Sequence, residues 1–326
     1  MPQDNIQSSF LEEVRKRLPP NLSFADELAE ILHISRDSAY RRIRGETVLS
    51  LEEVKLVCNH YGVSLDALLS PKAEMVSFHH RVVDQQSFTV DQWLKSILGN
   101  LEMLSGFPEE KYLIYSTPDI PVFYFFCNPM LAAFKLFVWM KTILQDARFA
   151  NVKFTPELIP TELLAVGKRI WEKYLALPCT EIWSHETFSV TLRQIEFYHE
   201  CGLFANSKQA MEICDSYLDM IRKIHDFAIR GTKDGLHGTF SLYKNELIVA
   251  DTTILFRMGD KRVAFITHNT MNLLTTTQES FCQHTERYMS NLQQRSVMLS
   301  PTGEKERIKY FNSIEANTQR LKETMI

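Results

Sequence analysis

The chain has 326 residues, which exceeds the usual size of a single hydrophobic core and predicts two domains. Its 45% hydrophobic and 23% charged residues are the proportions of an ordinary globular protein. A net charge of −4, from 36 Lys and Arg against 40 Asp and Glu, excludes a general attraction to nucleic acid, so any DNA binding has to come from a local basic patch.

Five short helices are expected in the first seventy residues. Apolar residues recur at helical spacing from Ile6 to Leu18, and Pro19 and Pro20 stop that pattern. The helices that follow are short and closely spaced, with a tight turn at His33 between the second and the third. The predicted helices cover residues 6–18, 24–32, 36–44, 51–61 and 65–69.

Serines and glycines mark the limits of these helices. Ser50 and Glu53 have the spacing of a capping box, in which the hydroxyl and the carboxylate each accept a backbone amide hydrogen. Ser23 and Asp26 repeat this pattern before the second helix. The other predicted caps are Ser35 and Ser64 at helix starts, and Gly45 and Gly62 at helix ends.

The third predicted helix, residues 36–44, has one apolar and one polar face. Ala39 and Ile43 are four residues apart and face the core, so the opposite side can face DNA. Arginine can grip guanine or a phosphate with two hydrogen bonds, and Asp37 can accept from cytosine. The candidate DNA-contacting residues of this helix are Arg36, Asp37, Ser38, Arg41, Arg42 and Arg44.

The amides at the start of the second helix, around Phe24 and Ala25, are a further candidate site because free helix amides can hold a phosphate. Ordinary electrostatics offers an alternative interpretation of the third helix, since basic residues near its end and Asp37 near its start both suit the helix dipole. The combination of five capped helices, a tight turn and a basic outer face favours DNA binding.

The segment 23–69 resembles the Cro and lambda-repressor-like helix-turn-helix family, often called the XRE family. The resemblance rests on the paired helices, on Gly45 after the second of them, and on Tyr-Gly-Val-Ser-Leu-Asp-Ala-Leu-Leu at the end. It implies a five-helix DNA-binding domain whose base-contacting positions fall on Arg36, Asp37 and Arg41. The chain departs from the family at Arg42, where an apolar residue is usual, so this side chain either contacts phosphate or packs its stem on the core.

The pattern of the remaining three quarters of the chain predicts mainly helices. The fold class is expected to be mostly α with a small antiparallel β meander near residues 239–268. The runs 239–249 and 252–268 are rich in β-branched and aromatic residues, with a turn at Met258–Lys261. The predicted domains are 1–72 for DNA binding, 73–88 as linker and 89–326 as a helix-rich domain for dimerisation or an effector. Its predicted helices cover residues 90–104, 129–144, 161–175, 186–201, 208–230, 278–299 and 304–324.

The aromatic segment 121–140 is about as long as a membrane span, but Asn128, Pro129 and Lys135 lie within it, so we expect a buried core segment. Its aromatic residues suit a core better than a ligand site, although a pocket stays open as an alternative. In its aromatic run and helix order this region is similar to uncharacterised domains that follow such headpieces in regulators of Bacteroidetes type.

No enzymatic site, cofactor or metal is expected. His199 with Cys201, and His79 with His80, could ligate a metal, but a closed site needs four ligands and no second pair lies nearby in the sequence. The six cysteines contain no C-x-x-C pair, which favours free thiols in a reducing cytoplasm.

The last predicted helix carries an apolar stripe of Ile308, Phe311, Ile314, Leu321 and Met325, which packs either within the chain or on a second subunit. Taken together, these patterns predict a bacterial, homodimeric transcriptional regulator that binds double-stranded DNA and responds to a small-molecule or peptide effector, without membrane attachment. The alternative is a protein- or peptide-binding helical module that its headpiece brings to DNA. An enzyme fused to a DNA-binding module has the least support.

Overall fold

The computed structural model describes residues 6–15, 17–18, 22–63, 65, 76–80, 88–233, 238–246 and 251–325. Contacts between residues divide the chain into two compact units, Met1–Ser77 and Phe78–Ile326. Almost all of the predicted fifth helix at residues 65–69, its cap Ser64 and most of the predicted linker lie outside the described residues.

The described part of the first unit contains four helices packed around one small core. Two of them, α2 and α4, have the predicted bounds, whereas α1 ends three residues and α3 one residue earlier than expected. The helices are α1 (Ile6–Arg15), α2 (Phe24–Leu32), α3 (Arg36–Ile43) and α4 (Leu51–Tyr61). The buried core residues are Phe10, Leu11, Val14, Leu28, Leu32, Ala39, Leu49, Val57 and Val63.

Most of the predicted helix caps are confirmed. The Ser50 hydroxyl accepts from the Glu53 amide at 3.2 Å, and the Glu53 carboxylate accepts from the Ser50 amide at 2.9 Å, which completes a capping box. Gly45 (φ 76°) and Gly62 (φ 63°) adopt the left-handed backbone that glycine favours. Ser23 occupies the predicted N-cap position of α2, but its side chain accepts no capping hydrogen bond, and Asp26 pairs with Arg36.

The second unit is built on a mixed sheet that is larger than the predicted small meander. Eight strands in the described residues pair in the order β1-β7-β6-β5-β2-β3-β4-β8, with β2, β3 and β4 parallel and the other pairs antiparallel. The strands are β1 (His79–His80), β2 (Lys111–Thr117), β3 (Cys179–Ser184), β4 (Phe240–Asn245), β5 (Thr253–Met258), β6 (Lys261–His268), β7 (Asn272–Thr276) and β8 (Val297–Met298).

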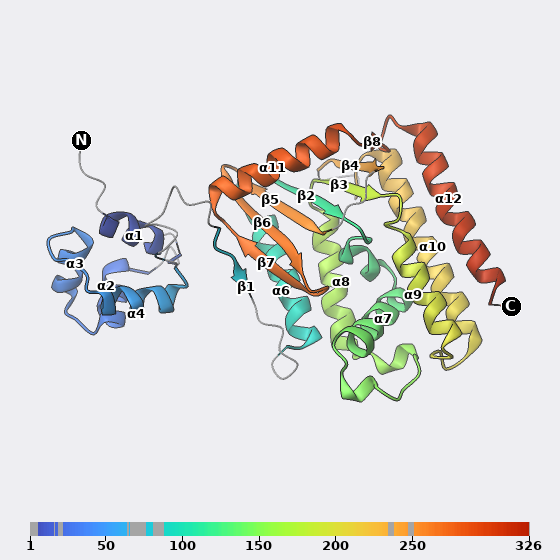
Figure 1. Cartoon of the computed structure of the whole chain (residues 1–326), viewed down its shortest axis with the longest axis horizontal. Coiled ribbons are helices and arrows are strands. Elements are labelled where there is room, and N and C mark those ends of the chain that lie inside the picture. Colours follow the sequence, from blue (N-terminus) through green and yellow to red (C-terminus); the bar gives the residue numbers. More distant parts are fainter. Residues whose placement is uncertain are drawn as a thin grey trace. The chain divides into compact units, whose positions relative to one another are not determined.

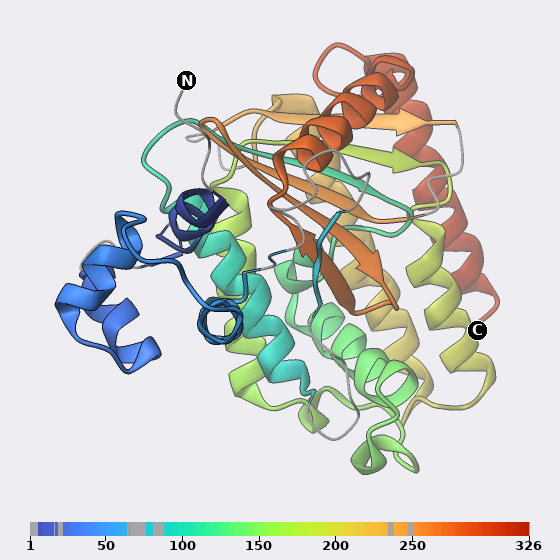
Figure 2. The same cartoon turned by 60° about the vertical axis from the view of Figure 1, so that its left-hand side comes forward.

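Only part of the meander forms as expected. The β5–β6 hairpin turns at Gly259 (φ 56°), and Met258 pairs with Lys261 across it. Figure 2 shows β5, β6 and β7 as adjacent orange arrows. In contrast, β4 pairs in parallel with β3, far from this hairpin, because β2 and β3 lie between β5 and β4 in the sheet.

Helices cover both faces of the sheet. In Figure 1, α11 crosses one face, where it contacts β6, while α6 and α8 pack together on the other side. The helices are α6 (Val90–Ser105), α7 (Pro129–Val138), α8 (Thr161–Leu175), α9 (Ser189–Glu200), α10 (Ser207–Arg230), α11 (Glu279–Gln294) and α12 (Glu304–Glu323), with short turns η1 (Val122–Cys127), η2 (Trp139–Ile143), η3 (Ala147–Phe149) and η4 (Pro156–Leu158).

Several predicted helices are confirmed with changed ends. The prediction for α8 is correct at both ends, whereas the expected helix 186–201 begins at Ser189. The expected helix 129–144 is divided into α7 and the π-helical turn η2. The expected helix 278–299 stops at Gln294, because Val297–Met298 pairs with β4 as strand β8.

The aromatic segment 121–140 is a buried core segment, as expected. It begins as η1, continues as α7, and contributes Phe123, Phe125, Phe134 and Phe137 to the main hydrophobic core. Across the described residues, no helix combines the length and the apolar character that crossing a bilayer would require.

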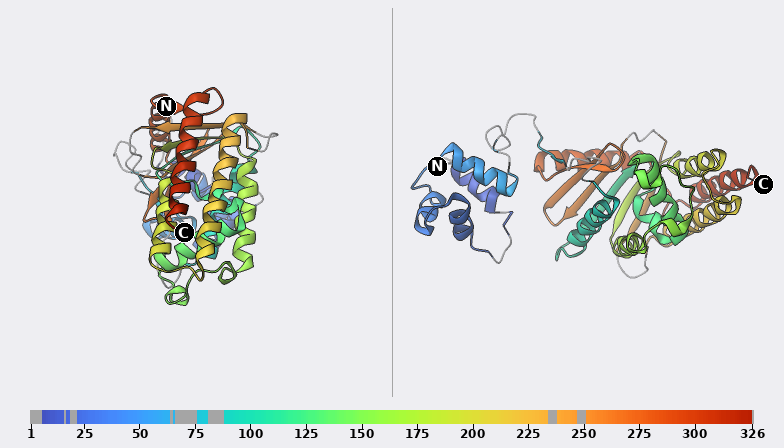
Figure 3. Two further views of the ribbon diagram at one scale, coloured as in Figure 1. Left: turned by 90° about the vertical axis from the view of Figure 1, so that its right-hand side faces the viewer. Right: turned by 90° about the horizontal axis from the view of Figure 1, so that it is seen from below.

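The terminal helix packs within its own unit. Phe311, Ile314 and Leu321 are buried, and α12 lies along α10 (Figure 3). Ile308 is an exception to the predicted stripe, since it is 44% exposed. This apolar face is therefore occupied by the chain itself.

Candidate nucleic-acid interface

A three-residue turn sets the angle between α2 and α3. His33 ends α2 in the left-handed conformation (φ 53°, ψ 42°), and the Ile34 amide donates to the Ala29 carbonyl at 3.0 Å. Ser35 then caps α3 by accepting from the Ser38 amide at 3.3 Å. This local geometry produces the tight helix pair that the sequence predicts.

The two faces of α3 have different surroundings. Ala39 is completely buried and Ile43 packs against the same core, so the inner face is held by the rest of the unit. The side chains of Arg36, Arg41 and Arg44 are 61%, 59% and 58% exposed. The outer face therefore presents three guanidinium groups to solvent.

Each exposed arginine has an acidic neighbour within the unit. The closest distances are 2.8 Å from Arg36 to Asp26, 3.6 Å from Arg41 to Asp37, and 3.1 Å from Arg44 to Glu46. Exposed ion pairs of this kind contribute at most about 1 kcal/mol to the stability of the fold. Exchange of these carboxylates for a DNA phosphate or a base edge therefore costs little free energy.

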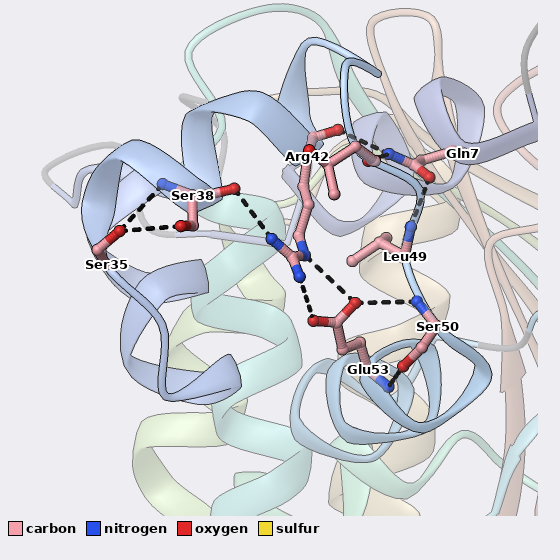
Figure 4. A network of polar contacts seen from close by, with 8 residues as sticks. Gln7, Ser35, Ser38, Arg42, Leu49, Ser50 and Glu53 are labelled. Atoms are coloured by element: carbon pink, nitrogen blue, oxygen red, sulfur yellow. Dashed lines mark hydrogen bonds and ion pairs between the residues drawn. The ribbon is translucent and has the colours of Figure 1, made fainter.

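Arg42 has a different role from the other three arginines. Its side chain is only 16% exposed, and its Nε and Nη2 donate to the two Glu53 carboxylate oxygens at 3.2 and 2.7 Å (Figure 4). Its Nη1 also donates to the Ser38 carbonyl at 3.3 Å. Partial burial by itself raises the pKa of Glu53, but hydrogen bonds from Arg42 and the Ser50 amide outweigh it and hold that pKa below its usual range. Arg42 thus links α3 to the start of α4.

Gln7 is a positioning residue that the sequence interpretation missed. Its Nε2 donates to the carbonyls of Arg42 and Thr47 at 2.8 and 2.9 Å, and its Oε1 accepts from the Leu49 amide at 2.8 Å (Figure 4). The signal for it was present: Gln7 precedes Phe10 at helical spacing and is a polar residue in an apolar stripe. It fastens α1 to the loop that follows α3.

Tyr40 is a second residue that was missed. It is 41% exposed on α3, and the Arg36 guanidinium carbon lies 5.7 Å from the centre of its ring. Ser38 is half-buried, and its hydroxyl lies 2.9 Å from that of Ser35. An exposed aromatic side chain beside three arginines adds an apolar contact surface to the same face.

The start of α2 leaves two amides available. Within the described residues, the first backbone hydrogen bonds of this helix are donated by Asp26 and Glu27 to the Ser23 carbonyl, and the Ser23 side chain accepts none. The amides of Phe24 and Ala25 are therefore free to bind an anion, although the Ala25 side chain itself is buried.

In the second unit, His80 of the His79–His80 pair contacts neighbouring strands of the sheet. Asn272 Nδ2 lies 2.7 Å from His80 Nε2, and the His80 ring packs edge-on against His268 at 5.4 Å. Across the ranges that the structure describes, His, Cys, Asp and Glu side chains form no group of three or more that could hold a metal ion.

A comparison with known protein families finds a match between residues 15–68 and the family model described as helix-turn-helix. No curated protein and no solved structure matches the chain. The family match covers α2, the turn and α3, where the exposed arginines lie. The chain therefore carries a helix-turn-helix domain, which supports a DNA-binding role.

Proposed function

We propose that the protein is a sequence-specific transcriptional regulator that places α3 in the major groove of double-stranded DNA. The observation that carries this proposal is the division of α3 into a buried face, held by Arg42 and Gln7, and an outer face with three exposed arginines. The concentration of positive charge on one short helix supplies the local patch that a chain of net charge −4 requires.

We assign different roles to the residues of this interface. Arg36, Asp37 and Arg41 lie at the beginning and middle of α3, where side chains reach base edges, and Ser38 and Tyr40 lie beside them. Arg44, at the end of the helix, and the free amides of Phe24 and Ala25 suit phosphate contacts, which position the domain without reading sequence. Arg42 braces the helix.

Replacing Arg41 with alanine is expected to weaken binding to the preferred DNA site by about 1 to 3 kcal/mol and to relax the base preference at one position. Selection of bound duplexes from a random pool, followed by titration of the full chain, measures both effects. Arg193→Ala is the matched control, since Arg193 is 67% exposed and paired with Glu186 in the second unit. Equal affinity of wild type and Arg41→Ala would remove Arg41 from the base-reading set.

The same titration at increasing salt separates the two kinds of contact. Loss of a phosphate-contacting arginine weakens all sequences alike and lowers the salt dependence, whereas loss of a base-reading arginine acts mainly on the selected site. Binding that does not decrease with salt would argue against the interface itself.

We propose further that the protein binds DNA as a homodimer. An α3 of eight residues reaches few bases, so a useful specificity requires two half-sites. We expect a two-fold symmetric footprint with half-site centres about 34 Å apart, one turn of the duplex. Footprinting of the selected site, together with sedimentation of the complex, measures this. A single unsymmetrical half-site bound by one chain would contradict it.

We assign the second unit to dimerisation and to effector binding, and we assign it no catalytic role. A cytoplasmic location follows from the proposal, because a regulator of this kind acts on chromosomal DNA.

A further inference from the structure

A cavity of about 160 Å³ lies in the second unit between α6 and the sheet. Trp93 and Ile97 of α6 line one side, and Phe256 and Phe265 of β5 and β6 line the sheet side. An engineered apolar cavity of about 150 Å³ is known to bind benzene, so this volume suits a molecule of about one ring.

The apolar part of the cavity is preformed. The Trp93 and Trp139 rings pack edge to face with centres 4.9 Å apart, and both line the cavity. Trp139 is buried at 7% exposure, and its position is fixed by further contacts with Phe125 and Phe126. A ligand therefore meets aromatic surfaces that already have their final positions, which reduces the entropy lost on binding.

The polar end of the cavity is rich in acceptors. Thr117 Oγ1 donates its proton to the Asp119 carbonyl at 2.7 Å. The hydroxyls of Thr117 and Thr252 lie 2.9 Å apart, and Thr252 is the donor in this contact because Thr117 has already used its proton. Thr267 Oγ1 donates to the Thr252 carbonyl at 3.2 Å. All three hydroxyl protons are thus used within the protein. Thr117 Oγ1 also accepts from the Asp119 amide at 3.2 Å, so the hydroxyl oxygens of Thr252 and Thr267 and the Asp119 carboxylate remain as acceptors.

Asp119 has unused acceptor capacity. One carboxylate oxygen accepts from the Ile120 amide at 2.7 Å, whereas the other lies 3.7 Å from Lys135 Nζ, beyond a good hydrogen bond. Lys135 is 1% exposed and donates instead to Gln194 at 2.8 Å and to Thr191 at 3.3 Å. Its charge still balances that of Asp119, so a ligand need carry no charge of its own.

Burial raises the pKa of Asp119 and lowers the pKa of Lys135, and the attraction between the two groups opposes both effects. The Lys135 ammonium also lies 4.1 Å from the centre of the Phe125 ring, another residue that lines the cavity. The ion pair is thus built into the wall, and the partly exposed Asp119 is the member that lines the cavity.

The cavity has a route to the surface. It is itself partly open to solvent, and a neighbouring cavity shares six lining residues with it: Trp93, Ile97, Asn100, Phe265, Met271 and Leu273. Asn100 and Tyr115, which also line the first cavity, can both donate and accept hydrogen bonds. A group that donates to Asp119 can therefore also accept a hydrogen bond from the wall.

We propose that this cavity binds a ring-sized, mainly apolar organic molecule whose hydroxyl or amine group donates a hydrogen bond to Asp119. This site belongs to the second unit alone and does not depend on the DNA-binding proposal. Aromatic walls of fixed position suit a single ring, and the acceptor-rich end disfavours carboxylates.

Four probes of similar size test the proposal on the full-length protein: benzyl alcohol, benzylamine, toluene and benzoate. Saturation-transfer NMR and calorimetry measure binding, and quenching of tryptophan fluorescence reports occupancy beside Trp93 and Trp139. We expect saturable binding of the alcohol or the amine, at least about tenfold tighter than toluene, and no binding of benzoate.

Two variants locate the probe. Asp119→Asn replaces a carboxylate acceptor with an amide. It is expected to weaken the binding of benzyl alcohol and benzylamine about tenfold and to change the affinity for toluene less than twofold. Asp91→Asn is the matched control, since Asp91 is an exposed carboxylate of α6 paired with Lys95. Ile97→Trp fills the cavity and is expected to abolish binding of all the probes.

Thermal melting checks that each variant folds. If Asp119→Asn does not fold, Thr252→Val takes its place, because this variant removes another acceptor at the polar end. The affinity for the alcohol and the amine is then expected to fall several-fold. Equal affinity for toluene and benzyl alcohol, tighter binding of benzoate, or full binding to Ile97→Trp would each overturn the proposal.

Discussion

Replacing Leu28 with alanine is expected to abolish DNA binding without unfolding the second unit. Leu28 is completely buried in the core of the first unit, which is separate from the core of the second. A buried leucine-to-alanine change costs about 2 to 5 kcal/mol, which is comparable to the entire stability of a domain of this size. Unfolding of α2 and α3 removes the interface altogether.

The distribution of tryptophan makes this prediction simple to measure. The four tryptophans, Trp93, Trp139, Trp171 and Trp183, all belong to the second unit. Tryptophan fluorescence during denaturation therefore follows the second unit, while circular dichroism follows both. We expect Leu28→Ala to remove part of the helical signal and leave the fluorescence transition in place.

Leu51→Ala is the control for Leu28→Ala, because Leu51 is a leucine of the same unit with 78% exposure and is expected to change little. A parallel shift of the fluorescence transition in Leu28→Ala would show that the two units unfold together. DNA binding that persists after loss of the helical signal would contradict the assignment of the interface to α3.

The second large effect is expected at Glu181, a completely buried carboxylate in the interior strand β3. It accepts from the Tyr124 hydroxyl and from the Trp183 indole, both at 2.9 Å. Desolvation by burial raises its pKa from 4.5 to about 7, although Lys233 and the two hydrogen bonds oppose this effect. The folded protein therefore binds a proton at Glu181 where the unfolded chain has released it.

The sign of the pH dependence follows from this difference. Between pH 4.5 and about 7 the folded state holds more protons at Glu181 than the unfolded state, so the stability from this group is present below pH 4.5 and is lost as the pH rises to about 7. Over this window we expect the free energy of unfolding of the wild type to fall by about 3 kcal/mol relative to that of Glu181→Gln, because glutamine does not titrate.

Denaturant unfolding followed by tryptophan fluorescence at pH 5 and pH 8 measures this difference. Glu186→Gln is the matched control, because Glu186 is 60% exposed and paired with Arg193. Parallel pH profiles for the wild type and Glu181→Gln would show that the buried carboxylate keeps an ordinary pKa.

Local patterns predicted much of the headpiece because its rules act over a few residues. The Ser35 cap, the Ser50–Glu53 capping box and the glycine ends depend on neighbours three or four positions away. The same is true of the outer face of α3. Arg42 could not be assigned in this way, because its partner Glu53 lies eleven residues further on, across a loop that Gln7 fastens.

The sheet could not be read from local patterns for two reasons. The interior strand β3 is buried along its entire length yet contains Thr180, Glu181 and Ser184, so it lacks the continuous apolar run of a buried parallel strand. Its neighbours β2 and β4 lie more than fifty residues away on either side along the chain. Pairing across such distances depends on the packed whole.

By itself, the sequence determined the helix-turn-helix, its exposed arginines and the buried character of the aromatic segment, because periodicity, capping and local charge leave a direct record in neighbouring residues. The tertiary structure alone decided the eight-stranded sheet, the bracing of Arg42 and Gln7, and the cavity with Asp119 at its polar end. These features join residues that are distant in the chain, and such contacts form only when the core brings their elements together.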